Sequence, residues 1–446
     1  MRCLPPAVLA SVALICFAHA SQCGERTAPF QMPPTGKPEQ LVGGLKYECG
    51  SALAFDTRNR PYMFHSREPA SFGYLLTLRE GKWVQLSYLD ALKKAFPKVK
   101  TPRWRQHAGG TMVIDDADAL YAVLFVEEEG KQGRAVVLLY SPDLGKSFHA
   151  YRLPGTAFLE IPVGHNKFDR PPAVGVLKFR KEYPTRWTRY YVLSVLFPEK
   201  QGGGLALGEP VEVTQDCFGI SNHSGGYSFA VTTGKKTHVV YAEIPKKPRG
   251  GNPTFIATVD RAARKVIAKQ FLVNAPPNTA DVHSTPVVAV DSKGHLHAVT
   301  GAHGGSFYYL RSKEPDRIDA GWTKPARVST GQTYATLICD KKDILHTVYR
   351  VHPRLHYQHK PAAGDRWSAR RVLVNPPPGH RGYSIFYHRL FIDRAGALYL
   401  SFTFWETRTK SKGRYPRALA VSEDGGATWR LATAETFGRR ARRPGK

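Results

Sequence analysis

The amino-acid sequence predicts an all-β protein, and more closely a seven-bladed β-propeller. Three observations lead to this prediction. A pattern of apolar strand, Asp-containing turn and second apolar strand recurs along the chain. Its copies are spaced by about 50–60 residues, which leaves room for three or four strands in each. Forty glycines and 33 prolines in 446 residues favour many tight turns over long helices.

Seven segments carry the repeated pattern: 49–65, 107–124, 171–196, 223–241, 281–312, 333–350 and 387–402. The third copy is looser than the others. The fifth copy shows the elements most clearly, with strands expected at 287–290, 295–300 and 306–311 and turns between them. Two packed sheets of a β-sandwich also use such strands, but a sandwich does not repeat them this regularly.

The N-terminus has the features of a secretory signal peptide. Arg2 is followed by the apolar run 7–17 and by Ala18-His-Ala20, an Ala-x-Ala cleavage site. We therefore expect a signal peptide at 1–20, one propeller domain at 21–437 and a basic, disordered tail at 438–446. Beyond the N-terminus no apolar run is long enough to span a membrane. The sequence thus predicts a secreted or periplasmic protein.

The cysteines give limited information about covalent structure. Two of the six lie in the signal peptide, which leaves Cys23, Cys49, Cys217 and Cys339. Four cysteines allow three pairings, of which Cys23 with Cys49 is the most local. They are too far apart in sequence for a Cys-x-x-Cys metal site. We expect no catalytic metal and no cofactor, and the sequence leaves a structural calcium or zinc ion open.

The charge balance points to a polyanionic partner. The chain has 64 Lys and Arg against 36 Asp and Glu, a formal net charge of +28. Such a charge attracts nucleic acid, anionic lipid or acidic polysaccharide. For an exported chain without a nucleic-acid-binding motif, we expect an anionic polysaccharide and no nucleic acid. A generally basic proteome is the alternative explanation. We expect the protein to be a monomer.

Candidate ligand-binding residues stand at the starts of the innermost strands, which line one mouth of a propeller's central channel. These are His107, His223, His283, Tyr334 and Tyr387. A single histidine is at least as often structural as catalytic, so the argument depends on their convergence. Four other histidines fall in second strands and are interpreted as structural: His238, His295, His297 and His346.

Two kinds of motif resemble known propellers. The segments 141–148 and 422–429 resemble the Asp-box hairpin of sialidase-like propellers, Ser-x-Asp-x-Gly-x-Thr-Trp; the second matches fully and the first ends in Ser-Phe. The run Asp281-x-His283-x-x-Pro286, continued by Gly-x-His303, resembles the BNR-4 family, which includes ulvan lyases and related uronic-acid polysaccharide lyases. Thr333-Tyr334 followed by Tyr349-Arg350 resembles the next blade of those enzymes. The resemblance covers about 281–350, later in the chain than the lyases place it.

The resemblance implies a lyase that cleaves an acidic, uronate-containing and sometimes sulfated polysaccharide by β-elimination. Its catalytic residues would be His283, His303, Tyr334 and Arg350. Arg350 and the histidines would neutralise the uronate carboxylate. Tyr334 is the first choice as base and His303 the second. The expected substrate-binding residues are His107, His223, Tyr308, Arg311 and Tyr387.

Two other classes of function stay open. A glycoside hydrolase on a uronate-containing glycan, for example a rhamnosidase-like enzyme, would usually need paired carboxylates, and the strand starts offer only Asp281. A sialidase is disfavoured because its N-terminal Phe/Tyr-Arg-Ile-Pro signature is missing. A non-catalytic, glycan-binding propeller is compatible with the sequence. The identity of the sugar and the choice between endo and exo action are also open.

Overall fold

The protein is all-β, as the sequence predicts. The computed structural model describes residues 30–31, 49–65, 73–97, 111–127, 134–182, 189–217, 219, 228–246, 250–277, 281–303, 305–331, 333–376, 385–404, 417–432 and 434–441. The predicted signal peptide and the predicted site residues His107 and His223 lie outside this range. Within it the strands form seven sheets of four or five strands, together with one two-stranded hairpin.

We number the sheets in chain order. The first has β2 (Cys49–Phe55), β3 (Pro61–His65), β4 (Tyr74–Arg79) and β5 (Lys82–Ser87). The second has β6 (Met112–Ile114), β7 (Leu120–Glu127), β8 (Arg134–Ser141) and β9 (His149–Leu153). The third has β10 (Thr156–Leu159), β11 (Val174–Glu182), β12 (Arg189–Leu196) and β15 (Val211–Cys217). The fourth has β16 (Ala230–Thr233), β17 (Lys236–Ala242), β18 (Asn252–Asp260) and β19 (Lys265–Ala275).

The fifth sheet has β20 (Val287–Val290), β21 (Leu296–Thr300), β22 (Tyr308–Glu314) and β23 (Arg317–Trp322), with β24 (Ala326–Arg327) also on β22. The sixth has β25 (Ile338–Cys339), β26 (Ile344–Val351), β27 (Arg354–Pro361) and β28 (Arg371–Asn375), with β1 (Phe30–Gln31) parallel to β28. The seventh has β29 (Ile385–Ile392), β30 (Leu398–Phe404), β31 (Arg417–Ser422) and β32 (Arg430–Leu431). The hairpin is β13 (Glu199–Gln201) with β14 (Gly204–Ala206), and the described helices are α2 (Leu89–Ala95) and α3 (Ala434–Ala441).

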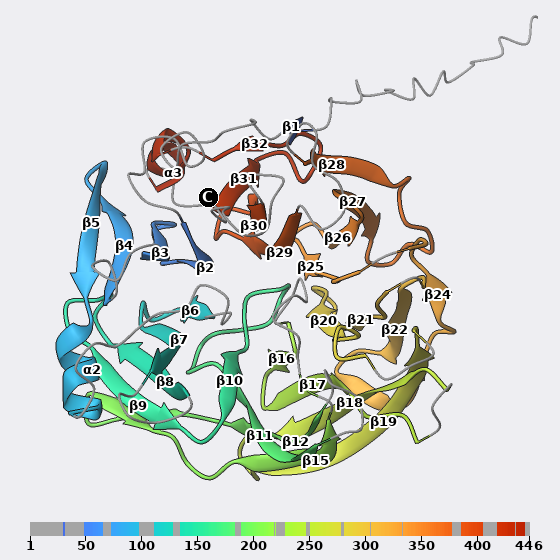
Figure 1. The fold of residues 1–446 in the computed structure, drawn as a ribbon, viewed down its shortest axis with the longest axis horizontal. Helices are drawn as coiled ribbons and strands as arrows, with labels where there is room; N and C mark the ends of the chain where they lie inside the picture. Colours follow the sequence, from blue (N-terminus) through green and yellow to red (C-terminus); the bar gives the residue numbers. More distant parts are fainter. Residues whose placement is uncertain are drawn as a thin grey trace, which may run out of the picture.

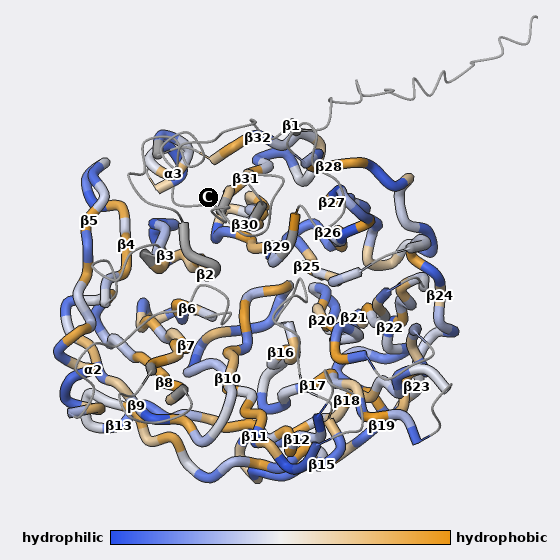
Figure 2. Tube along the Cα trace, viewed as in Figure 1, coloured by the Kyte–Doolittle hydropathy of each residue, from blue (hydrophilic) through white to orange (hydrophobic). Residues whose placement is uncertain are grey.

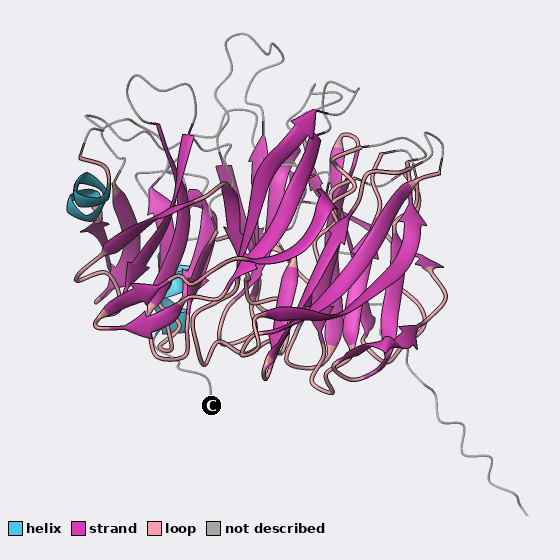
Figure 3. Cartoon of the chain, turned by 90° about the horizontal axis from the view of Figure 1, so that it is seen from below, coloured by secondary structure: helices cyan, strands magenta, loops and turns pink. Residues whose placement is uncertain are grey.

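The sheets follow one another around a common centre, with the seventh beside the first (Figure 1). Apart from β1, which pairs parallel with β28 at the outer edge of the sixth sheet, the strand nearest the centre of each sheet is the first in sequence, and its neighbours pair antiparallel outward. Seen from the side, most strands run between the two faces of the molecule (Figure 3). All residues at the starts of the first strands therefore lie toward the same face, which is the arrangement that the site prediction needs.

Six of the seven predicted copies coincide with the first two strands of a sheet, and the third copy does not. Residues 171–196 form β11 and β12, the second and third strands of the third sheet, whereas its first strand is β10. The prediction was wrong there because β10 and β11 are separated by a long connection instead of the short Asp-containing turn.

A recurring geometry, which we call the Asp turn, joins the first and second strands of five sheets. In each, one carboxylate oxygen accepts hydrogen bonds from the backbone N–H groups two and four residues later, at 2.7–3.1 Å. The aspartates are Asp56, Asp115, Asp291, Asp340 and Asp393. The residue three positions later has a positive φ, which favours Gly, Asn or Asp: Asn59, Asp118, Gly294, Asp343 and Gly396.

The Asp turns also connect neighbouring sheets. Thr57 donates its N–H and its hydroxyl to the carboxylate of Asp118, both at 2.8 Å, which links the first and second sheets. Ser292 donates in the same way to Asp343, which links the fifth and sixth sheets. Each contact joins the position after one aspartate to the left-handed position of the next turn. The Asp turns therefore carry side-chain contacts that link these two pairs of neighbouring sheets.

Asn59 makes the corresponding connection between the last sheet and the first. Its side-chain Nδ2 donates to Asp393 at 3.1 Å, and its Oδ1 accepts from the N–H of Arg394 at 2.8 Å. Helix α3 reinforces this seam, since Phe437 packs against both Trp83 of the first sheet and Tyr399 of the seventh. The two ends of the repeat thus meet through side chains rather than through a shared strand.

The hydrophobic core consists of layers between adjacent sheets. One buried cluster joins the first and second sheets, another the second and third, and another the third and fourth. The first two strands of the fifth sheet, β20 and β21, are buried along their whole length. This burial agrees with their mainly apolar residues. In Figure 2 hydrophobic residues run mainly along strands such as β7 and β8.

Residues 160–168, which we call the central segment, leave β10 and cross the centre of the ring. His165 donates its N–H to Val290 of the fifth sheet at 3.0 Å, and Val163 accepts from the N–H of Cys339 of the sixth at 2.9 Å. Gly164 permits this approach, because a Cβ there would stand 2.2 Å from the Val290 carbonyl oxygen. Buried Glu160 anchors the segment by accepting hydrogen bonds from Thr232 of the fourth sheet.

The two Asp boxes form local turns, as the sequence predicts. Gly426 donates its N–H to Ser422 at 2.8 Å, Thr428 donates its N–H to Asp424 at 2.9 Å, and 141–148 repeats this pattern. Helix α3 extends through residues 438–441 of the segment expected to be disordered, because Arg440 pairs with the carboxylate of Asp393. Residues 442–446 lie outside the described range.

The remaining predictions about the chain have separate outcomes. Cys217 and Cys339 are free thiols and both are buried, while pairing of Cys23 with Cys49 stays a prediction. No helix in the described part of the chain is long and apolar enough to cross a membrane.

Replacing Asn59 tests the connection between the seventh and first sheets. Asn59→Gly removes two hydrogen bonds of a buried group, and we expect the free energy of unfolding to fall by about 1–3 kcal/mol. Asn59→Ala removes the same bonds and adds about 1–2 kcal/mol for a left-handed residue with a Cβ. Asn59→Ala should therefore be less stable than Asn59→Gly, although alanine is usually the less destabilising replacement of the two. Urea unfolding measures both variants; equal stability of wild type and Asn59→Gly would show that the connection is dispensable.

Candidate active site

The residues at the start of the fifth sheet are arranged around one carboxylate. Asp281 accepts hydrogen bonds from the N–H of His283 at 2.9 Å and from its ring Nδ1–H at 2.7 Å. The second Asp281 oxygen lies 3.7 Å from Nε2 of His303, which follows β21 in the same sheet. One acidic group therefore orients two imidazoles whose sequence positions differ by twenty residues.

The two histidines form a cluster with Tyr334 of the sixth sheet. The rings of His283 and His303 are 4.7 Å apart and nearly perpendicular. The ring of Tyr334 lies 5.6 Å from that of His283 and 5.9 Å from that of His303. Residues from two neighbouring sheets thus meet at the face where the first strands begin.

Arg350 completes the cluster from β26. Its guanidinium carbon lies 4.5 Å above the centre of the Tyr334 ring, a cation–π arrangement. Thr333 and Arg350 exchange two backbone hydrogen bonds, of 3.0 and 2.9 Å, which hold Tyr334 and Arg350 at neighbouring positions. Tyr334 has a φ of +64°, a costly conformation for a tyrosine. The surrounding contacts hold it there.

His388 of the seventh sheet supports the cluster from behind. Its ring lies 6.4 Å from that of Tyr334, and its Nε2–H donates to the Tyr334 carbonyl oxygen at 2.8 Å. Because a carbonyl oxygen only accepts, this bond fixes the proton on Nε2. His388 is fully buried, and burial lowers the pKa of its ring to about 4. The ring is therefore neutral at ordinary pH.

The exposed groups of the cluster are the two histidines. The side chains of His303 and His283 are 38% and 24% exposed, whereas Tyr334 and Arg350 are 1% and 0% exposed. Burial lowers the pKa of His303, an effect that the nearby Asp281 opposes and the neighbours His283 and Arg350 add to. His303 is thus an accessible imidazole that stays unprotonated near neutral pH.

The carboxylate at the centre stays ionised. Burial raises the pKa of Asp281, but the hydrogen bonds from His283 and the nearby His303 outweigh this, so that its pKa lies below its ordinary value. Ligand atoms of Asp281, His283 and His303 all lie within 4.8 Å of one another, so the three residues have the geometry to hold a cation.

The structure brings together the four predicted catalytic residues and separates one predicted binding residue from them. Tyr308 pairs with Thr300, at the end of β21 that leads to His303. Arg311 pairs with His297 instead, and its guanidinium lies 3.9 Å from Asp291 at the opposite end of the sheet. The register of β22 therefore places Arg311 away from the cluster. Tyr387 is half-buried in β29, and His107 and His223 lie outside the described residues.

Sequence reasoning missed His388 and chose its neighbour Tyr387. Adjacent residues of a strand face opposite sides, so the choice depends on register. A bulge between Phe386 and Arg389 changes that register in β29. The histidine at the start of the seventh copy was the only available signal, and it could not show which side chain faces Tyr334.

The histidines interpreted as structural have mainly intramolecular partners. His297 bonds to Tyr309 and Asp291, at 2.7 and 3.2 Å, and His346 bonds to Tyr357 at 2.7 Å and lies 3.2 Å from Asp340. His238 bonds to Thr258 and Asp316. Two of them extend the Asp turns, since each ring meets the carboxylate six residues before it.

The fold and the site together define an all-β protein of repeated four-stranded sheets with a His–His–Tyr–Arg cluster on one face. Residues 253–444 match the model of the family described as "BNR repeat-containing family member". The matched region contains His283, His303, Tyr334 and Arg350, which confirms the family resemblance expected from their motifs. No curated protein matches the sequence.

Several solved structures are similar at low identity. An ulvan lyase of family PL25, bound to -[GlcA(1-4)Rha3S]-, is 11% identical with a TM-score of 0.47, covering 86% of this chain and 96% of its own. An α-L-arabinanase of Penicillium chrysogenum is 14% identical with a TM-score of 0.42, covering 70% and 92%. The GH93 α-L-arabinofuranosidase of Fusarium graminearum is 14% identical with a TM-score of 0.44, covering 72% and 95%.

The buried, neutral ring of His388 makes stability depend on pH. Its folded pKa of about 4 lies below the ordinary value of 6.5, so the unfolded chain binds a proton first. The stabilisation is complete above pH 6.5 and is lost as the pH falls toward 4, by roughly 3 kcal/mol at most. We expect the difference in the free energy of unfolding between pH 7 and pH 5, measured with urea, to be smaller for His388→Gln than for the wild type. The glutamine amide can still donate to the Tyr334 carbonyl oxygen. Exposed His149→Gln is the control; an unchanged pH dependence in His388→Gln would contradict the assignment.

Proposed function

We propose that this protein is a lyase that cleaves an acidic, uronate-containing polysaccharide by β-elimination at the cluster of His283, His303, Tyr334 and Arg350. The observation that carries the proposal is the convergence of these four residues from two sheets around Asp281. β-Elimination needs cationic groups for the uronate carboxylate and a base for the proton at C5, and this cluster contains both.

Exposure decides which residue meets the substrate. His303 and His283 are accessible, while Tyr334 is buried beneath them. We assign the proton-accepting role to His303, which is accessible and has a lowered pKa. This reverses the order expected from the sequence, in which Tyr334 came first. His283, held by Asp281, then faces the carboxylate, and Arg350 adds positive charge through its contact with Tyr334.

A glycoside hydrolase is the second candidate, and the arrangement of acidic groups favours it less. Hydrolysis with a nucleophile or with an activated water usually uses two carboxylates on either side of the bond. In the described part of the cluster, Asp281 is the carboxylate in contact with the histidines, and its oxygens are engaged by them. A binding protein without catalysis would not need an accessible base beside cationic groups.

The proposal includes the remaining features expected from the sequence. We propose that the seven sheets are the blades of one closed propeller domain, which the contacts of Asn59 with Asp393 and Arg394 support. We also propose that the chain is exported, because of its Ala18-His-Ala20 cleavage pattern, and that its +28 charge attracts the polyanionic substrate.

The first experiment incubates the purified protein with ulvan, glucuronan, heparinoids, chondroitin and pectate, following ultraviolet absorbance and reducing ends. A lyase forms an unsaturated uronate, which absorbs. We expect an absorbance rise with one substrate and a loss of about 100- to 10,000-fold in kcat for His303→Ala, the usual effect of removing a general base. Tyr334→Phe should retain more activity than His303→Ala.

Exposed His149→Ala on β9 controls for nonspecific effects of removing a histidine and should keep the wild-type rate. New reducing ends without absorbance would establish a hydrolase instead. Binding without either signal would establish a glycan-binding protein. Wild-type activity of His303→Ala, with lost activity of Tyr334→Phe, would return the base role to Tyr334.

The net charge predicts a salt effect on substrate capture rather than on the chemical step. Raising the ionic strength from about 0.01 to 1 M shortens the Debye length from about 30 to 3 Å. We expect KM for the polymer to rise severalfold while kcat changes little, because the charges that attract the chain are spread over the surface. A short uronate oligosaccharide should show a weaker effect. Equal KM values at both salt concentrations would contradict electrostatic attraction.

A further inference from the structure

A second group of potential ligands lies at the opposite end of the sheets from the candidate active site. His165 comes from the central segment, Cys339 ends β25, and Asp343 occupies the Asp turn that follows. His283 precedes the first strand of its sheet, whereas Cys339 ends the first strand of its own sheet and Asp343 follows it. The two groups therefore share no residue and occupy different faces. Nothing in the proposed reaction uses these three side chains.

The three ligand atoms converge. Nε2 of His165 lies 3.1 Å from Oδ1 of Asp343, and Sγ of Cys339 lies 3.9 Å from the same oxygen. All three are within 4.8 Å of one another. In a tetrahedral zinc site with bonds of about 2.0–2.3 Å, ligand atoms are roughly 3.3–3.7 Å apart. Shifts of less than about 1 Å therefore convert the observed spacing into a coordination shell.

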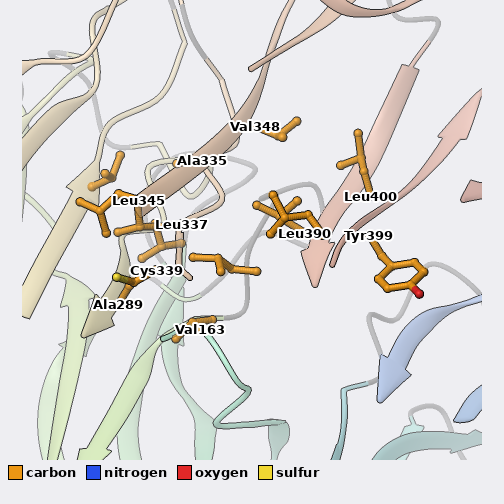
Figure 4. Packing of buried hydrophobic residues seen from close by; sticks show 14 of the residues in the cluster. Val163, Ala289, Ala335, Leu337, Cys339, Leu345, Val348, Leu390, Tyr399 and Leu400 are labelled. Carbon is orange, nitrogen blue, oxygen red and sulfur yellow. The ribbon is translucent and has the colours of Figure 1, made fainter. Parts of the chain in front are cut away.

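A fourth oxygen stands at the same place. The backbone carbonyl of Asp340 is 3.1 Å from Nε2 of His165 and 3.8 Å from Sγ of Cys339. The backbone that carries the ligands is held by hydrogen bonds, from His165 N–H to Val290 at 3.0 Å and from Cys339 N–H to Val163 at 2.9 Å. Figure 4 shows Cys339 beside Val163 and Ala289 in the packed core. The donor atoms are therefore preorganised.

We propose that His165, Cys339 and Asp343 bind a zinc ion that ties the central segment to the sixth sheet. A thiolate, an imidazole and a carboxylate together suit zinc, whereas calcium and magnesium prefer oxygen ligands alone. The side chains of His165 and Asp343 are 28% and 30% exposed, which gives the ion a path from solvent, while Cys339 is buried behind them.

Without a metal the same groups form a hydrogen-bonded cluster. His165 Nε2 then shares its proton with Asp340 and Asp343, while Asp343 also accepts from Ser292. A divalent cation deprotonates a coordinating thiol, so in this proposal Cys339 binds the ion as a thiolate.

The test uses the full-length protein after removal of metal with a chelator. Zinc is added and its stoichiometry is measured after desalting, together with the thermal midpoint. Cobalt is added in a parallel experiment, because a thiolate ligand gives an absorption band from sulfur-to-cobalt charge transfer. We expect this cluster to bind one zinc ion, zinc to raise the thermal midpoint, and cobalt to give a thiolate–cobalt absorption band.

Four variants separate this site from others. Cys339→Ser and His165→Gln should lose the cobalt band and the thermal shift. Cys217→Ser removes the other buried free thiol and should keep both. His283→Ala removes a ligand of the other cluster and should also keep both. A folded wild-type protein without the thiolate–cobalt band, or zinc binding retained by Cys339→Ser and lost by His283→Ala, would overturn the proposal.

Discussion

The structure depends on the carboxylate that closes each Asp turn. One oxygen of the aspartate satisfies two backbone N–H groups that a tight turn leaves unpaired, and such buried donors are costly when unsatisfied. In some of these turns the other oxygen bonds the side chain six residues later, as with Tyr121 for Asp115 and His297 for Asp291. The left-handed residue of the turn then reaches the neighbouring sheet. Local turn chemistry thereby also sets the arrangement of sheets around the centre.

The two ends of the sheets have different physical characters. At the Asp-turn end, hydrogen bonds join one sheet to the next, and the central segment crosses the middle and brings His165 to Cys339 and Asp343. At the other end, the starts of the first strands carry His283 and Tyr334, whose positions depend on contacts between two sheets. A rigid end thus supports a face on which accessible imidazoles stand beside buried cationic and aromatic groups.

Much of the fold follows from local sequence, because its determinants are close in the chain. Apolar strands, the aspartate between them and the residue suited to a positive φ lie within a few positions of each other. The prediction was wrong for the third copy because its determinants are not local. The central segment separates the first strand of that sheet from the second, so no short turn marks the pair. The motifs around His283 and Tyr334 were also readable, since each stands at a fixed position before its strand.

The sequence by itself determined the strand–turn repeat, the Asp boxes and four members of the site, since short-range patterns encode them. Only the tertiary structure decided which of these groups meets solvent, because burial depends on neighbouring sheets: Tyr334 lies beneath His303, and His388 faces it through a bulge that shifts the register. Tertiary structure also moved Arg311 away from the cluster and brought His165 to Cys339. The contacts of His165 with this part of the sixth sheet join residues more than 170 positions apart in the sequence, and no local pattern encodes a contact over such a separation.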